Sequence, residues 1–307
     1  MTSHSEPKGA PILQVLIVAY GREGIDSVAS LAHPEVEGVE YLVSWQTADC
    51  LELTVAAPEE IQAAIPAALR EREDFRIFPS DTSGVSLNRN LVLDRASAPL
   101  AICSDDDVAY LPEDLHNIIE TFNRHPEADF IAFEYRSDTP KRYPSESFDL
   151  ARPPKGYYIG GPEMAFRLES IRRHGIRFNE WFGIGCEFPA GEEDLFLADC
   201  LDAGLKCIFL PVAVCRHDGD STGEREHLSP TFIRTKGAIL GRLHPATWPL
   251  RMILHALRSP TPHSLKASLA YCRYWLRGVA DSRRLKVFAP RISVDTPRDM
   301  PLHSKNS

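Results

Sequence analysis

Residues 84–110 read GVSLNRNLVLDRASAPLAICSDDDVAY, and this stretch decides the fold. It predicts a helix with Ser86 as its N-cap, a short apolar strand over residues 100–103, and then three carboxylates, Asp105 to Asp107. Ligands of open α/β sheets bind at the carboxyl ends of strands. Three adjacent carboxylates repel one another and favour a nearby cation. Taken alone, the triplet fits a metal site and a solvated acidic turn equally well.

Strand-like and helix-like segments alternate on both sides of this stretch. Strands are expected at residues 13–19, 39–45, 75–78, 100–104 and 128–133, and helices at 25–31, 57–72 and 112–122. Regular alternation predicts an α/β fold with a doubly wound, mostly parallel sheet. The sequence has neither GxGxxG nor GxxxxGK[ST], so it carries no dinucleotide fingerprint and no P-loop.

The second half continues this organisation and then changes character. A polar, proline-rich loop is expected at 136–156, a turn into a strand at 160–166, a helix at 192–203, strands at 207–210 and 214–217, and basic helices at 232–243, 248–257 and 265–279. The predicted organisation is a disordered leader (1–10), a main domain (11–232), a C-terminal helical extension (233–290) and a disordered tail (291–307).

Charge is distributed unevenly along the chain. The formal net charge is −9, but residues 1–233 carry 20 Lys and Arg against 40 Asp and Glu, whereas residues 234–307 carry 14 against 3. The basic end therefore meets something anionic: lipid head groups, an anionic acceptor or the acidic body itself. Basic amphipathic helices are typical of membrane-surface contacts, and equally of a small helical subdomain packed on an acidic body.

Cysteines and apolar runs indicate the compartment. The seven cysteines are scattered without a CxxC pair, which argues against a disulfide framework and a zinc site. The N-terminus lacks a signal-peptide apolar region, and no apolar run approaches the length of a spanning helix. The sequence predicts a cytoplasmic protein, with the basic helices as a peripheral contact to the inner membrane face and no nucleic-acid partner.

Residues around the acidic triplet favour its interpretation as a metal site. Mg²⁺ is held by one or two carboxylates together with substrate phosphates, so Asp105 and Asp107 are candidate metal ligands, with Asp106 supporting them. His217, at a strand end, is a third candidate ligand. Just before the strand, Gly84, Ser86, Arg89 and Asn90 lie at a helix start, which attracts anions. The alternative for Arg89 is an ion pair with Asp94 or with the triplet.

A second acidic group, Glu192-Glu193-Asp194, opens a later helix. Acidic residues in a first helical turn often serve only the helix dipole. The functional interpretation is a general base that takes a proton from an acceptor hydroxyl.

This ordered set resembles the family 2 glycosyltransferases with the GT-A fold over roughly residues 12–223. Residues 84–110 resemble the family's G-x-S-x-x-R-N … DDD block, GEEDLFLADCLDAGLKCIFLP (191–211) its GED helix, 214–217 its terminal strand and histidine, and LQVLIVAYGR (13–22) its first nucleotide-contacting strand. Two segments depart from the family pattern: VAYG replaces PTYN after the first strand, and SWQTAD replaces DDGSxD after the second. These departures affect base recognition most.

The resemblance implies a metal-dependent, inverting glycosyltransferase. It would use Mg²⁺ or Mn²⁺ and move a sugar from a nucleotide-diphosphate sugar, a UDP-sugar by expectation, to a glycan or lipid-linked acceptor in polysaccharide or glycolipid synthesis. The catalytic carboxylate falls on Glu193 or Asp194. The expected donor-binding residues are Ala19, Tyr20, Gly21, Arg22, Gln46, Gly84, Ser86, Arg89, Asn90, Asp105, Asp106 and Gly161. The alternatives are a nucleotidyltransferase, which would release pyrophosphate, and a degenerate GT-A domain that binds only a sugar or a partner.

Overall fold

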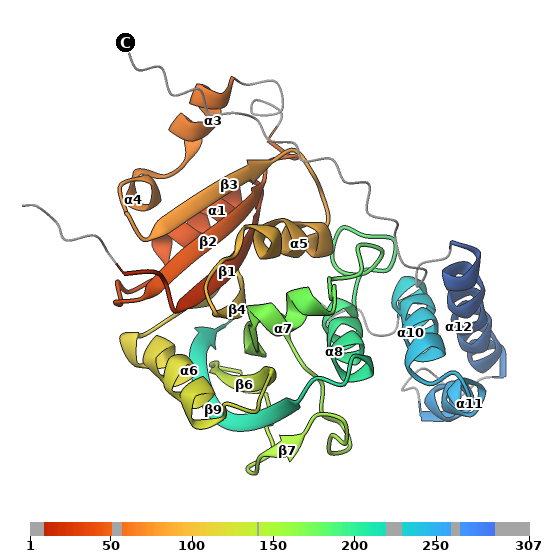
Figure 1. Cartoon of the computed structure of the whole chain (residues 1–307). Helices are drawn as coiled ribbons and strands as arrows, with labels where there is room; N and C mark the ends of the chain where they lie inside the picture. Colours follow the sequence, from red (N-terminus) through yellow and green to blue (C-terminus); the bar gives the residue numbers. More distant parts are fainter. Residues whose placement is uncertain (1–8, 51–56, 140, 219–228, 259–264, 286–307) are drawn as a thin grey trace, which may run out of the picture.

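The computed structural model describes residues 9–50, 57–139, 141–218, 229–258 and 265–285 (Figure 1). The predicted tail lies outside these residues, as does the predicted leader apart from Gly9 and Ala10.

A nine-stranded sheet, ordered β3-β2-β1-β4-β8-β6-β9-β5 with β7 beside β9, organises the body. Six strands run parallel: β1 (Leu13–Tyr20), β2 (Val39–Gln46), β3 (Phe75–Ser80), β4 (Leu100–Asp105), β6 (Phe130–Arg136) and β9 (Cys207–His217). The antiparallel strands are β5 (Val108–Ala109), β7 (Phe148–Asp149) and β8 (Met164–Arg167). The predicted mostly parallel α/β sheet is therefore confirmed, with β8 inserted in the opposite direction between β4 and β6.

Helices cover both faces of the sheet. They are α1 (Gly21–Ser30), α3 (Pro58–Ala64), α4 (Ala67–Arg70), α5 (Val85–Arg95), α6 (Pro112–Arg124), α7 (Leu168–Arg173), α8 (Glu192–Asp202) and the short 3₁₀ turn η1 (Gly161–Glu163). Strand β1 is buried on both sides: Val15 and Ile17 belong to the core with α1 and α6, while Leu16 and Val18 belong to the core with α5, α7 and α8. Such alternation within one apolar run is what a central parallel strand requires.

Three local expectations can be compared with the structure in detail, and the N-cap of α5 was wrong. Helix α5 is capped by Gly84, whose φ of +101° favours glycine, and Ser86 lies inside the helix. The helix expected over 57–72, with a kink at Pro66, divides there into α3 and α4: Ile65 adopts ψ 129° because a following proline disfavours the helical conformation. The two strands expected within 207–217 form the single strand β9.

The C-terminal helices form a separate unit beside α8 (Figure 1). They are α10 (Pro230–Leu243), α11 (Trp248–Arg258) and α12 (Leu265–Arg284). Gly237 and Gly278 allow helices α10 and α12 to cross closely. A Cβ on Gly237 would lie 2.2 Å from the Trp275 carbonyl oxygen, and a Cβ on Gly278 would lie 1.8 Å from the Arg234 carbonyl oxygen. Among the described residues, none of the helices is long and apolar enough to cross a membrane.

Candidate active site

The acidic triplet leaves the carboxyl end of β4, and its three side chains have different partners. Asp105 Oδ1 lies 3.0 Å from the Arg89 guanidinium. A Cβ on Gly24 would lie 2.4 Å from Asp106 Oδ2, so Asp106 lies against the start of α1. Asp107 Oδ2 lies 3.1 Å from His217 Nε2 at the end of β9. Arg89 and His217 thus reduce the repulsion expected within the triplet at Asp105 and at Asp107.

Burial and the neighbouring charges of Asp105 and Asp107 raise the pKa of Asp106 to about 6, although the Tyr20 backbone N–H opposes this by donating to its carboxylate. Burial alone would lower the pKa of His217, but its hydrogen bond to Asp107 and the adjacent carboxylates outweigh that effect and raise it. Both shifts follow from acidic side chains gathered at one edge of the sheet.

Arg89 joins this edge to the start of α8. Its guanidinium donates to Glu193 Oε1 at 2.8 Å and lies 3.5 Å from Glu192 Oε1, in addition to its pair with Asp105. The side chain is only 5% exposed and stacks over the Phe178 ring at 5.3 Å. One buried cation therefore holds together carboxylates from segments about 90 residues apart in sequence.

The three acidic residues at the start of α8 lie in different surroundings. Glu192 is buried, and burial together with the charge of Glu193 raises its pKa against the influence of Arg89. Asp194 is accessible to solvent at its surface. Desolvation by the protein packed around it, together with the charge of Glu193, nevertheless raises the pKa of Asp194 to about 6, while Lys141 lowers it. An accessible carboxylate with a raised pKa suits a general base.

A second buried cation lies nearby in the polar loop. Lys141 donates to Glu163 Oε1 at 2.6 Å and to the Tyr158 carbonyl oxygen at 2.6 Å, and its ammonium lies 4.0 Å from the Tyr158 ring centre. Glu163 also accepts from the Tyr143 hydroxyl at 2.8 Å. This pair fixes η1, whose first residue, Gly161, lies against Arg89: a Cβ there would be 2.4 Å from the guanidinium.

Comparisons with known proteins agree with this geometry. Residues 56–188 match the family described as glycosyl transferase family 2. Residues 56–188 form a family 2 glycosyltransferase domain, and the enzyme is a glycosyltransferase. This result decides against the nucleotidyltransferase interpretation. No curated protein sequence matches the chain.

Solved structures give the fold of this glycosyltransferase as GT-A. The Staphylococcus aureus protein TarS, residues 1–349, superimposes with a TM-score of 0.51 and 15% identity over 92% of this chain and 75% of that one. The same fragment in complex with UDP-GlcNAc gives a TM-score of 0.56 and 16% identity over 87% and 81%. Against the longer TarS structure (TM-score 0.52, 16% identity, 91% of this chain), the glycosyltransferase spans about half the other chain's length, 49%.

Several predicted donor-binding residues have structural partners within the glycosyltransferase. Ser86 donates to the Phe182 carbonyl oxygen at 2.7 Å, and Asn90 donates to that of Phe178 at 2.9 Å. Gln46 is buried and donates to the Gly84 carbonyl oxygen at 3.2 Å. These hydrogen bonds connect α5 and the residue before it to neighbouring segments of the protein.

The turn after β1 is more accessible. Tyr20 is 47% exposed, while Arg22 donates to the Ala64 carbonyl oxygen and Gly21 accepts from the Trp45 indole N–H at 2.8 Å. The Ala19 carbonyl oxygen accepts from Asn88 Nδ2 at 3.1 Å.

Asp49 lies directly beside this turn and was not among the predicted site residues. Its carboxylate would be 2.3 Å from a Cβ on Gly21. The signal was its position after β2, where the family pattern places an acidic segment.

The predicted metal ligands are only partly brought together. Asp107 and His217 are in contact, whereas Asp105 is held by Arg89. Among the described residues, no group of three or more His, Cys, Asp or Glu side chains is arranged to hold a metal ion.

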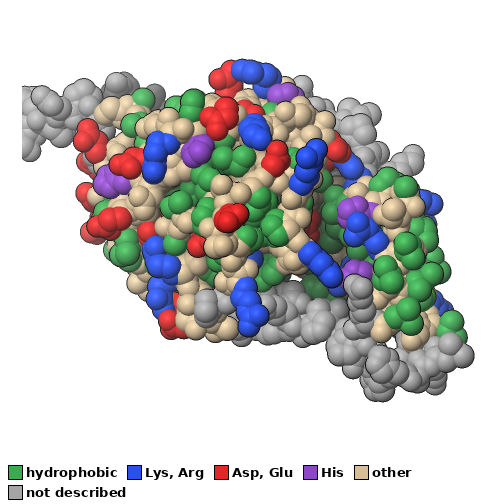
Figure 2. All heavy atoms as spheres, turned by 90° about the horizontal axis from the view of Figure 1, so that it is seen from below, with side chains coloured by type: hydrophobic (Ala, Val, Ile, Leu, Met, Phe, Trp, Pro, Cys, Tyr) green, Lys and Arg blue, Asp and Glu red, His purple; other side chains and the backbone are tan. Residues whose placement is uncertain are grey.

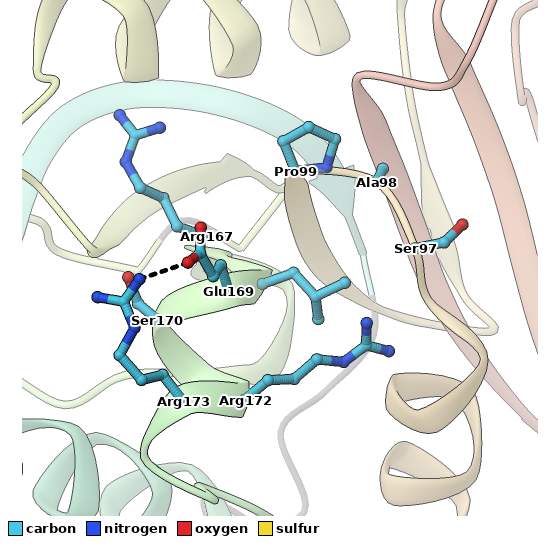
Figure 3. A pocket seen from close by; sticks show the side chains of 9 residues that line it. Ser97, Ala98, Pro99, Arg167, Glu169, Ser170, Arg172 and Arg173 are labelled. Carbon is cyan, nitrogen blue, oxygen red and sulfur yellow. Dashed lines mark hydrogen bonds and ion pairs between the residues drawn. The ribbon is translucent and has the colours of Figure 1, made fainter.

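A cavity of about 610 Å³ lies at the opposite, amino end of β4, between α7 and the segment before that strand (Figure 3). Its arginines serve the fold: Arg172 donates to the carbonyl oxygens of Leu93, Asp94 and Ala96, and Arg167 donates to that of Phe122. This cavity is remote from the acidic edge of the sheet and is separate from the candidate active site.

Proposed function

We propose that this glycosyltransferase moves a sugar from a nucleoside diphosphate sugar to an acceptor hydroxyl with inversion at the anomeric carbon. The observation that carries the proposal is the Arg89 bridge, because it joins Asp105 at the end of β4 to Glu193, next to Asp194. A site for the donor phosphates and a site for proton removal are thereby adjacent. TarS structures with UDP-GlcNAc and with UDP make UDP-sugars the first donors to test.

The donor would lie along the carboxyl edge of the sheet, between β1 and β4. The exposed Tyr20 and the carboxylate of Asp49 border the nucleoside end, and the triplet borders the diphosphate. Gly161 allows η1 to approach this edge closely, because a Cβ there would lie 2.4 Å from the Arg89 guanidinium and 3.4 Å from Asp105 Oδ2.

Asp107 and His217 fit a divalent cation. Their facing Oδ2 and Nε2 atoms are 3.1 Å apart, close to the separation of about 3 Å expected for neighbouring octahedral ligands at about 2.1 Å from Mg²⁺. Asp107 is 44% exposed on its side chain, which leaves access for phosphate oxygens and water to complete the coordination. Bound Mg²⁺ or Mn²⁺ would stabilise the negative charge on the leaving nucleoside diphosphate.

Asp194 is the better candidate for the base. Glu193 is committed to Arg89, whereas Asp194 is accessible and carries a raised pKa of about 6. Asp194 would accept the proton of the acceptor hydroxyl, and the resulting oxygen nucleophile would attack the anomeric carbon as the bond to the diphosphate breaks. A single displacement from the opposite side inverts the anomeric configuration.

The decisive experiment compares Asp194→Asn with Glu193→Gln. Loss of a general base reduces kcat by about 10²–10⁴-fold, so Asp194→Asn should show that loss while retaining donor binding in a thermal-shift assay with UDP-sugars and Mn²⁺. Glu193→Gln should retain proton transfer but lose some stability, because Arg89 loses one charged partner. Equal kcat for Asp194→Asn and the wild type would remove the assignment of the base.

Two further measurements test the rest of the reaction. The anomeric proton coupling in the product, measured by NMR, tests inversion, and full activity in excess EDTA would contradict the role of the metal. Absence of both transfer and donor hydrolysis across a panel of nucleotide sugars would instead indicate a degenerate domain that only binds. The acceptor class that we propose is a glycan or a lipid-linked sugar.

A further inference from the structure

Helix α11 carries an exposed aliphatic stripe. Leu250, Ile253, Leu254 and Leu257 are 60%, 49%, 39% and 64% exposed. The spacing i, i+3, i+4, i+7 places all four on one side of the helix. Scattered surface leucines are ordinary, but a row of neighbouring ones indicates an interaction surface.

The opposite side of α11 is already used for packing. Ala256 is buried in a core with Tyr271 and Trp275, and Met252 and Trp248 pack against the same core. The exposed stripe therefore lies on the side of α11 that faces away from this core. It is the second apolar side of a helix whose first side is satisfied.

Helix α12 adds exposed leucine and arginine side chains. Leu269 and Leu276 are 61% and 47% exposed, and Arg273 and Arg277 on the same helix are also exposed. We call the α11 stripe the outer apolar face, and Leu269 and Leu276 are further exposed leucines on the neighbouring helix α12. Figure 2 shows apolar side chains gathered over the helical unit, with basic and histidine side chains among them.

The charge of this unit is strongly positive. Residues 229–285 contain ten Lys and Arg and a single acidic residue, Asp281. Arg234 and Arg242 are turned toward the body, where they pair with Glu187 and with Asp199. Within the described part of the chain, Arg273 has no acidic partner within ion-pair distance.

We propose that the outer apolar face docks on an anionic lipid bilayer. Aliphatic side chains on one side of a helix with flanking arginines match the apolar and anionic layers at a membrane surface. A second copy of this chain suits the face poorly, because a symmetric contact would bring two strongly basic units together. The contact that we propose is peripheral, with the helix lying along the membrane surface.

The unit is fixed to the catalytic helix, so docking would orient the site. Gly191, the N-cap of α8, packs against Ile239 of α10 so closely that a Cβ would lie 2.1 Å from its Cδ1. Arg242 of α10 pairs with Asp199 and Asp202 of α8 at 3.2 and 2.7 Å. A bilayer held by α11 would therefore lie at a set orientation to the start of α8, which bears Asp194.

The test is co-sedimentation of the full chain with vesicles made of equal parts phosphatidylglycerol and phosphatidylcholine. We expect the Ile253→Asp/Leu257→Asp double variant to lower the partition coefficient more than about tenfold, because it removes two aliphatic side chains that would enter the bilayer. The matched control is Leu111→Asp, which alters a 52% exposed leucine on the body and should bind as the wild type does. Arg251→Gln/Arg273→Gln should lower binding by about fivefold per arginine at low salt, with less effect at high salt.

The outcomes are separable from those of the catalytic proposal, because vesicle binding needs no donor. Donor hydrolysis and thermal stability should be unchanged in the Ile253→Asp/Leu257→Asp variant, which reports that the fold is intact. Three results would overturn the proposal: no binding by the wild type, equal binding by this double variant, or a wild-type dimer that the variant converts to monomer. The last result would identify the face as a contact between copies.

Discussion

Replacing Arg89 with methionine tests whether one buried cation holds the two halves of the site together. The substitution keeps most of the side-chain volume and removes the charge shared by Asp105, Glu192 and Glu193. Breaking a buried ion pair by removing one partner costs about 3–5 kcal/mol, because the remaining charge stays buried. Glu192 is 7% exposed and Glu193 18%, so solvent can screen little of their charge. We therefore expect the free energy of unfolding at pH 7 to fall by about 3–5 kcal/mol.

The pH dependence of this loss has a defined sign. In the wild type the pKa of Glu192 is already raised above its ordinary value of 4.5, and removing Arg89, which lowers it, would raise it further. The folded variant then holds a proton that the unfolded chain releases, so its stability falls as pH rises above about 4.5. The loss caused by Arg89→Met should be smaller at pH 5 than at pH 7. Adding Glu192→Gln should recover part of it.

Urea denaturation at the two pH values measures both effects. The matched control is Arg177→Met, which removes an exposed ion pair with Asp94 and should cost less than about 1 kcal/mol. If Arg89→Met cost no more than this control, or cost the same at both pH values, Arg89 would not be the centre of a buried charge cluster.

Three further changes probe the same site. Lys141→Met removes a positive charge that lowers the pKa of Asp194. The acidic limb of the kcat/KM profile, expected near pH 6 in the wild type, should therefore move to higher pH. An unchanged limb would show that Lys141 does not influence the pKa of the general base. Gly161→Ala brings a methyl group against the Arg89 guanidinium and should cost about 1–3 kcal/mol of stability, measured by urea denaturation, with activity reduced in parallel. His217→Ala should raise the Mn²⁺ concentration needed for half-maximal activity by at least about tenfold, and an unchanged Mn²⁺ requirement would exclude this ligand.

The sequence predicts most of the sheet because each buried strand has a pattern that depends on no distant partner. The apolar run of β1 reads as a two-sided strand, and the structure buries it on both faces. The acidic triplet follows a similar run in β4, so its position at the edge of the sheet could be predicted as well. Local hydrophobic pattern was sufficient for both.

The partners of Arg89 and Asn90 could not be predicted in the same way. Both residues read as donors at a helix start, where an anion binds. Their partners, Glu193 and the Phe178 carbonyl oxygen, lie 104 and 88 residues later in the chain. Nothing local distinguishes a guanidinium that faces a ligand from one that faces another segment of the protein. The alternative of a pair with the triplet, which the sequence left open, is what the structure shows for Arg89.

The sequence left the choice between Glu193 and Asp194 open for the same reason, and the structure supports our proposal of Asp194. Consecutive residues on an α-helix point about 100° apart, so the side chains of Glu192, Glu193 and Asp194 cannot all face one fixed cation. Arg89 is held on α5 by Asp105 and Phe178, and it engages Glu193. The geometry of the helix then leaves the next carboxylate, Asp194, outside this cluster and accessible to an acceptor. The buried ion pair therefore joins the two acidic segments, and in the reaction that we propose it leaves Asp194 as the carboxylate available for proton transfer.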